Sequence, residues 1–161
     1  MTYVSFFQTL HQSRVRYLLC GGLAVNIYGI QRATADIDLI LDFEKENINR
    51  FLAAIKSCGY AAALPVDLSN FISEEKRKEI ISEKNLIAYS FFNSAAGMMS
   101  VDVLMDVPIS FEKLWGNRIS HGENDFEIQL VSISDLIDLK KYSNREQDKM
   151  DIVSLLKLKA K

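Results

Sequence analysis

The sequence predicts an α/β or α+β protein with a small mixed β-sheet and flanking helices. Short apolar runs that end at glycine or polar residues alternate with longer segments whose apolar residues recur at helical spacing. The chain has 161 residues, enough to bury one core without disulfides or metals as supports. We therefore predict a single domain over residues 1–161, with a core of about 14–110 and a C-terminal helical portion of about 111–161.

The predicted strands are apolar runs too short for helices. They lie at residues 17–20, 36–41, 86–92, 99–107 and 126–131. The first ends at Gly21-Gly22, which predicts a tight turn into the next element. The pair at 86–92 and 99–107 flanks Asn93 to Gly97, which predicts a hairpin around that segment.

The predicted helices show helical apolar spacing or capping residues at their ends. They lie at residues 3–13, 23–28, 43–58, 67–84, 132–139 and 146–158. Asp42 is the predicted N-cap of the third helix, and Gly59 its C-terminal stop. In the last helix, Met150, Val153 and Leu156 fall on one face.

Composition excludes several classes of protein. The net charge is −2 and the pI is about 5.7, which argues against binding of nucleic acid through bulk positive charge but leaves a local basic patch open. No apolar run reaches the length of a transmembrane helix, and the N-terminus does not resemble a signal peptide. We expect Cys20 and Cys58 to be reduced core residues of a cytoplasmic protein with no membrane partner.

Three acidic residues lie in apolar strands. Asp36 and Asp38 alternate along one strand, so their side chains share a face while Ile37 points into the core. Carboxylates about 6–7 Å apart repel each other unless a cation lies between them, and oxygen ligands suit Mg²⁺. Asp102 lies in a second apolar strand. The alternative is a solvated acidic pair on an edge strand, but the Leu-Ile-Leu at 39–41 predicts a central one.

The turn at Gly21-Gly22 follows a strand and precedes a helix. Backbone N–H groups can approach an anion closely at such a turn, although a lone Gly-Gly is more often an ordinary connection. Together with the three acids, the turn suggests two-metal phosphoryl or nucleotidyl transfer.

Taken together, Gly21-Gly22, the Asp36-Ile37-Asp38 run and the distant Asp102 resemble the signature of DNA polymerase beta-type nucleotidyltransferases. The run from Gly21 to Leu39 is similar to stand-alone bacterial proteins around the AbiEii abortive-infection toxins. The C-terminal residues Lys140, Arg145, Asp148 and Asp151 resemble the same group more weakly, so the resemblance covers about residues 15–160. Gly22 stands where many members have serine, so that hydroxyl is not available to a phosphate.

The resemblance implies a nucleotidyltransferase fold with a C-terminal helical cap over the nucleotide. It implies two Mg²⁺ ions, or Mn²⁺, held by Asp36, Asp38 and Asp102, with Asp102 also helping to deprotonate the attacking hydroxyl. It implies that Gly21 and Gly22 hold the triphosphate of an NTP, either ATP or GTP.

Three further side chains, Arg32, Thr34 and Lys140, complete the predicted site. Arg32 and Thr34 precede the acidic strand and are predicted to bind the nucleotide; the alternative for Arg32 is a surface or loop role. Lys140 follows an apolar helical face and is predicted to neutralise the triphosphate; the alternative is a snorkelling surface lysine. Because we expect Lys140 to be partly exposed, its removal should leave stability nearly unchanged. Asp148 and Asp151 share one helix face and either orient Lys140 or Arg145 or form a salt-bridged surface.

The predicted reaction is transfer of NMP from an NTP to a hydroxyl. The acceptor is open: an RNA such as a tRNA 3′ end or a protein in a toxin–antitoxin setting with a cognate antitoxin, or a small molecule such as an antibiotic. The low net charge favours a small or protein acceptor over a long RNA. A non-catalytic nucleotide- or partner-binding role is the alternative from a different class.

Overall fold

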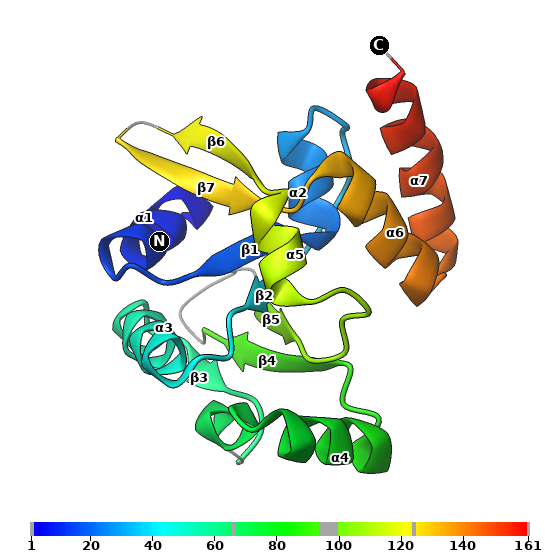
Figure 1. Cartoon of the computed structure of the whole chain (residues 1–161). Helices are drawn as coiled ribbons and strands as arrows, with labels where there is room; N and C mark the ends of the chain where they lie inside the picture. Colours follow the sequence, from blue (N-terminus) through cyan, green and yellow to red (C-terminus); the bar gives the residue numbers. More distant parts are fainter. Residues whose placement is uncertain (1, 66, 94–99, 124, 161) are drawn as a thin grey trace.

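The computed structural model describes residues 2–65, 67–93, 100–123 and 125–160 (Figure 1). The helices are α1 Tyr3–Gln12, α2 Gly21–Ile27, α3 Lys45–Ser57, α4 Glu74–Lys84, α5 Phe111–Gly116, α6 Ile133–Ser143 and α7 Glu146–Lys159, with a 3-10 helix η1 at Leu68–Phe71. The strands are β1 Tyr17–Cys20, β2 Asp36–Leu41, β3 Ala61–Ala62, β4 Ala88–Phe92, β5 Ser100–Leu104, β6 Ile119–Glu123 and β7 Phe126–Leu130.

The described strands form one mixed sheet in the order β3-β4-β5-β2-β1-β7-β6. Strand β2 pairs antiparallel with β1 and parallel with β5, and β1 pairs parallel with β7. This confirms the predicted mixed α/β class. Strands β4 and β5 pair antiparallel as predicted, while residues 94–99 of the predicted hairpin turn lie outside the described residues. The proposed division at about residue 110 stays a prediction.

One face of the sheet carries the apolar core. Phe7 of α1 stacks on Tyr17 of β1, and Phe51 of α3 packs edge-on against Phe91 of β4. Ile37 of β2 lies on this same face, because alternate residues of a strand point to opposite sides. Side chains at even positions of β2 therefore point to the other face, where the acidic residues lie.

Some predicted element boundaries are wrong for local reasons. Asp42 does not cap α3: Glu44 is the N-cap, and the Asp42 carboxylate instead accepts a bond from the Glu44 N–H and pairs with Arg16. The predicted helix at 67–84 is two elements, η1 and α4, because Ser73 caps α4 with its hydroxyl. Helix α5 and strand β6 were not predicted. Gly59, at φ +80°, does end α3.

Helix α7 packs through a polar face. Met150, Val153 and Leu156 do share a face, but that face is exposed. The residues that α7 buries are Asp148, Asp151 and Leu155. Among the described helices, none has the length and apolar character needed to cross a membrane.

Candidate active site

The three predicted acids lie on one face of the sheet. Asp38 of β2 and Asp102 of β5 are register partners, and Asp36 is opposite Ser100. Because paired residues of neighbouring strands point to the same side, all three carboxylates share this face. Asp36 accepts a hydrogen bond from the Ser100 hydroxyl at 2.5 Å. The sequence therefore placed the acids correctly with respect to the sheet.

The surroundings of Asp38 change the pKa of its carboxyl group. Burial raises the pKa of Asp38, and the neighbouring charges of Asp102 and Asp36 raise it further. A hydrogen bond from the Gly22 backbone N–H and the charge of Arg145 act in the opposite direction. The net effect raises the pKa of Asp38, so its environment disfavours the charged carboxylate, and a cation beside it would relieve that effect.

Asp102 carries the clearest sign of a missing partner. Its Oδ1 is buried and accepts no hydrogen bond in the part of the chain that the structure describes. Buried polar atoms are nearly always satisfied, so this oxygen needs a ligand or a proton. The described residues do not form a ready-made cluster of three metal ligands. The acids therefore fit a cation by donor type and by the unpartnered oxygen, while their coordination of one stays a prediction.

The glycine turn lies against the acids. Gly21 has φ +62°, and a Cβ there would collide with the Asp38 carboxylate. A Cβ at Gly22 would lie 2.5 Å from Arg32 Nη1 and 2.6 Å from Thr34 Oγ1. The structure thus brings together all four predicted nucleotide-binding residues. The two glycines serve different needs: Gly21 adopts the positive φ, whereas Gly22 provides space for the Arg32 and Thr34 side chains.

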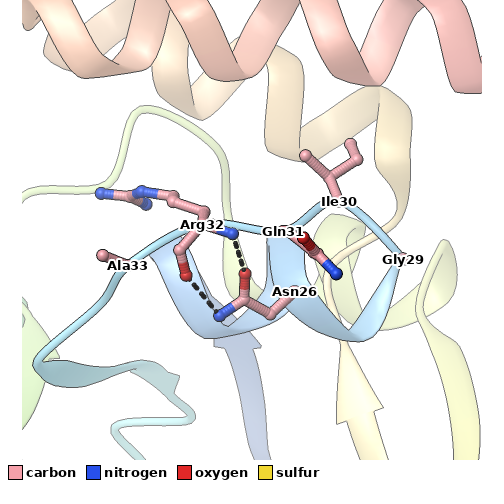
Figure 2. A pocket seen from close by; sticks show the side chains of 6 residues that line it. All are labelled: Asn26, Gly29, Ile30, Gln31, Arg32 and Ala33. Atoms are coloured by element: carbon pink, nitrogen blue, oxygen red, sulfur yellow. Dashed lines mark hydrogen bonds between the residues drawn. The ribbon is translucent and has the colours of Figure 1, made fainter.

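Arg32 is held by its main chain and by its side chain. The side-chain amide of Asn26 exchanges two hydrogen bonds of 2.9 Å with the Arg32 backbone, beside the loop at 29–33 that lines a shallow pocket (Figure 2). The guanidinium Nη1 lies 3.2 Å from Asp151 Oδ2. Arg32 Nε is buried and has no acceptor among the described residues. Arg32 is therefore held beside the glycine turn, with its Nε donor unpaired, and not on the open surface.

Lys140 lies inside a cluster of charges between α6 and α7. Its side chain is 4% exposed, and Nζ lies 2.6 Å from Asp151 Oδ2 and 3.3 Å from Asp148 Oδ1. Arg145 Nε donates to Asp148 Oδ2 at 2.9 Å, and the Ser143 hydroxyl donates to the same oxygen. The expectation of a partly exposed Lys140 is wrong, because both aspartates of α7 turn inward and pair with it.

Asp148 is the most strongly stabilised anion of this cluster. Burial raises its pKa, but hydrogen bonds from Arg145 and Ser143 and the charge of Lys140 outweigh that effect and lower it to about 2. Asp151 contacts both Lys140 and Arg32. The cluster therefore connects the two C-terminal helices to the glycine turn through ion pairs.

A cleft of about 480 Å³ opens over Asp38 and Asp102. Gly21, Lys140, Arg145 and Asp148 also line it, while Asp36, Gly22, Arg32 and Thr34 do not. Its remaining wall is mostly apolar and is formed by Cys20, Ile87, Ala88, Leu104, Val107, Pro108, Leu136 and Leu139, with Asp106, Tyr142 and Ser143 as further polar residues.

Sequence analysis missed the outer residues of the cleft. The Tyr142 hydroxyl donates to Asp106 Oδ2 at 2.8 Å across 36 positions of sequence, a distance that no local pattern reveals. One signal was available for Asp106, which follows Asp102 and Leu104 at alternate positions.

The family of the chain identifies it as a nucleotidyltransferase. The chain belongs to the family described as nucleotidyltransferase of unknown function (DUF6036), whose model matches residues 7–158. This confirms the prediction of a nucleotidyltransferase, while the finer resemblance to AbiEii toxins stays a prediction. No curated protein sequence matches the chain.

A solved structure shares the fold over nearly the whole chain. The lincosamide antibiotic adenylyltransferase LnuA, solved with lincomycin bound, is similar with a TM-score of 0.61 and covers 98% of each chain at 17% sequence identity. At this identity the likeness establishes the fold, and the acceptor must be argued from this chain's own residues.

Proposed function

We propose that this nucleotidyltransferase transfers NMP from an NTP to a hydroxyl of its acceptor in a reaction that needs divalent cations. The observation that carries the proposal is the unpartnered buried oxygen of Asp102 beside Asp38, in a cleft that also includes Gly21. Two facing carboxylates with an unsatisfied oxygen have no structural purpose in a central sheet unless a cation or a proton joins them.

The residues that would hold the cations are Asp36, Asp38 and Asp102. All their donors are carboxylate oxygens, which suit two Mg²⁺ ions, with Mn²⁺ as a substitute. Bound ions would supply charge stabilisation at the α-phosphate and at the departing pyrophosphate. The raised pKa of Asp38 supports this assignment, because a cation would remove the repulsion that raises it.

The protein side chains would perform the remaining tasks. Asp102 Oδ1 is free to accept the proton of the attacking hydroxyl. The hydroxyl oxygen forms a bond to the α-phosphorus, the bond from that phosphorus to the β-phosphate bridging oxygen breaks, and pyrophosphate leaves. The turn at Gly21 and Gly22, with Arg32 and Thr34 beside it, would bind the triphosphate.

Lys140 would act mainly through its neighbours. Its ammonium is neutralised by Asp148 and Asp151, and these carboxylates in turn hold Arg145 and Arg32. We therefore assign Lys140 as a positioning residue that keeps both arginines at the nucleotide end of the site. Direct neutralisation of the triphosphate is then the task of Arg32 and Arg145.

The candidate biological roles of this reaction differ in the acceptor that receives the NMP. An RNA 3′ end or a protein hydroxyl would fit a cytoplasmic toxin paired with an antitoxin. The likeness to LnuA, which is solved with lincomycin, introduces a small antibiotic as the second candidate. A protein that binds nucleotide or a partner without catalysis would contradict the proposal.

The test is label transfer from α-³²P-labelled ATP or GTP in a cell lysate, with Mg²⁺, Mn²⁺ or EDTA, followed by separation of RNA, protein and small molecules. We expect transfer with either metal and none with EDTA. Asp102→Asn should abolish transfer, whereas Asp138→Asn, which changes an exposed carboxylate of α6, should not. Nucleotide binding without any label transfer, or transfer that survives Asp102→Asn, would overturn the proposal.

A further inference from the structure

If the proposed function holds, the strand order indicates on which side of the acids the triphosphate and the acceptor lie. Gly21 follows β1, Asp38 lies on β2, Asp102 on β5 and Ala88 on β4, and these strands are neighbours in the order β4-β5-β2-β1. The triphosphate end therefore lies on the β1 side of the acids. Phosphoryl groups transfer with the attacking and leaving oxygens roughly in line, so the acceptor hydroxyl approaches from the β5 and β4 side.

The part of the cleft on that side is apolar and accessible. Ile87, just before β4, is 68% exposed and lines the cleft. Leu104, Val107 and Pro108 extend the same wall, and Leu136 and Leu139 of α6 also line the cleft. A concave apolar surface with a few polar groups is the usual form of a site for a small ligand, and the volume of the whole cleft, about 480 Å³, falls within the range of such sites.

A carboxylate without an ion pair lies among the polar groups of this wall. Asp106 accepts a hydrogen bond from Tyr142, whose side chain is 55% exposed. In the described ranges Asp106 has no salt bridge, because the basic residues lining the cleft, Lys140 and Arg145, pair with Asp148 and Asp151 instead. The outer cleft thus offers a negative charge with no cation of the protein beside it.

We infer that this outer part of the cleft, lined by Ile87, Leu104, Asp106 and Val107, is the acceptor subsite. It binds a compact molecule with three features. The acceptor has an apolar body that packs on Ile87, Leu104 and Val107, a hydroxyl that reaches Asp102, and a protonated amine that pairs with Asp106. An RNA backbone does not match this part of the cleft, since its phosphates would meet an apolar wall that carries the Asp106 carboxylate.

Three simple probes separate these features. 2-Amino-3-phenyl-1-propanol has the amine, hydroxyl and apolar body; 3-phenyl-1-propanol lacks the amine; and 2-amino-1-propanol lacks the apolar body. Binding to the full chain is measured by saturation-transfer NMR and calorimetry, first without nucleotide and then with ATP and Mg²⁺. We expect the complete probe to bind about tenfold more tightly than either partial probe, as a charge-assisted contact and a buried ring predict.

Two variants assign the contacts. Asp106→Asn should remove the advantage of the amine and leave 3-phenyl-1-propanol unaffected, whereas Ile87→Ser, at an exposed position that cannot threaten folding, should weaken both phenyl probes. Asp138→Asn is the matched control on α6 and should change nothing.

Several results would overturn the acceptor subsite. One is equal affinity for all three probes, or no binding of any of them. Another is a loss of ATP affinity in Asp106→Asn as large as its loss of affinity for 2-amino-3-phenyl-1-propanol. A third is labelled RNA in the lysate whose yield is unchanged in Ile87→Ser. Failure of ATP to bind the wild-type chain would contradict the proposed function instead, and the probe titrations without nucleotide distinguish the two.

Discussion

Replacement of Lys140 by alanine tests the buried charge cluster directly. The side chain is 4% exposed, and its Nζ contacts Asp151 at 2.6 Å and Asp148 at 3.3 Å. Alanine would remove the cation and leave two carboxylates in the interior between α6 and α7. We expect a large loss of stability, in contrast to the small loss that an exposed lysine would give.

The remaining contacts determine the size of the loss. Removal of one partner of a buried ion pair costs about 3–5 kcal/mol. Each aspartate would keep one arginine, Arg145 at 2.9 Å from Asp148 and Arg32 at 3.2 Å from Asp151, so we expect the lower end, about 3 kcal/mol. For a chain of this size, 1 kcal/mol corresponds to about 2–4 °C, which gives a fall in Tm of about 6–12 °C.

The assay is thermal and urea unfolding of wild type, Lys140→Ala and Lys141→Ala at pH 7. Lys141 is the adjacent control, because its side chain is 61% exposed and pairs with Asp138 at the surface. Lys141→Ala should change the free energy of unfolding by less than about 0.5 kcal/mol. The triple variant Lys140→Met, Asp148→Asn and Asp151→Asn should recover part of the stability that Lys140→Ala loses. Equal Tm values for Lys140→Ala and Lys141→Ala would refute the reasoning.

Three further outcomes are expected. Gly21→Ala should lower the transfer rate by displacing the Asp38 carboxylate, whereas Gly29→Ala, also at a positive φ but with open space around it, should show only the backbone strain of about 1–2 kcal/mol. Asp38→Asn should raise Tm at pH 7, because the raised pKa means that folding penalises the charged form; the gain should disappear as pH falls toward the ordinary value of 3.8, and a constant gain at all pH values would contradict this. Cys20 and Cys58 are buried, so neither thiol should react with Ellman's reagent before unfolding.

The acidic strand was predictable because local and global signals agree there. The six residues from Asp36 to Leu41 form β2 with the predicted bounds, since polar and apolar positions alternate at its start and the rest is fully apolar. Alternation alone placed Asp36 and Asp38 on one face. The apolar residues around Asp102 placed it in a second strand, but its position on the same face as Asp38 required the parallel pairing of β2 with β5.

The C-terminal helices were harder to predict because their buried face is charged. Apolar spacing identified Met150, Val153 and Leu156 as a face of α7, yet Asp148 and Asp151 are the ones buried. Hydrophobic periodicity assumes that apolar groups bury first, and this helix departs from that rule because Lys140 and two arginines pair with its aspartates. The Asp106 to Tyr142 contact was equally hidden, since it joins a loop to a distant helix.

The central position of β1 has a consequence for synthesis of the chain on the ribosome. Strand β1 ends at Cys20, yet its parallel neighbour β7 begins at Phe126. At about 5–20 residues per second, the nascent β1 waits on the order of 10 s for that neighbour. During this interval an apolar strand has one hydrogen-bonding edge without its native partner, and such edges pair readily with other chains. The edge of β1 that faces β7 is therefore open to pairing with other chains until most of the protein has been synthesised.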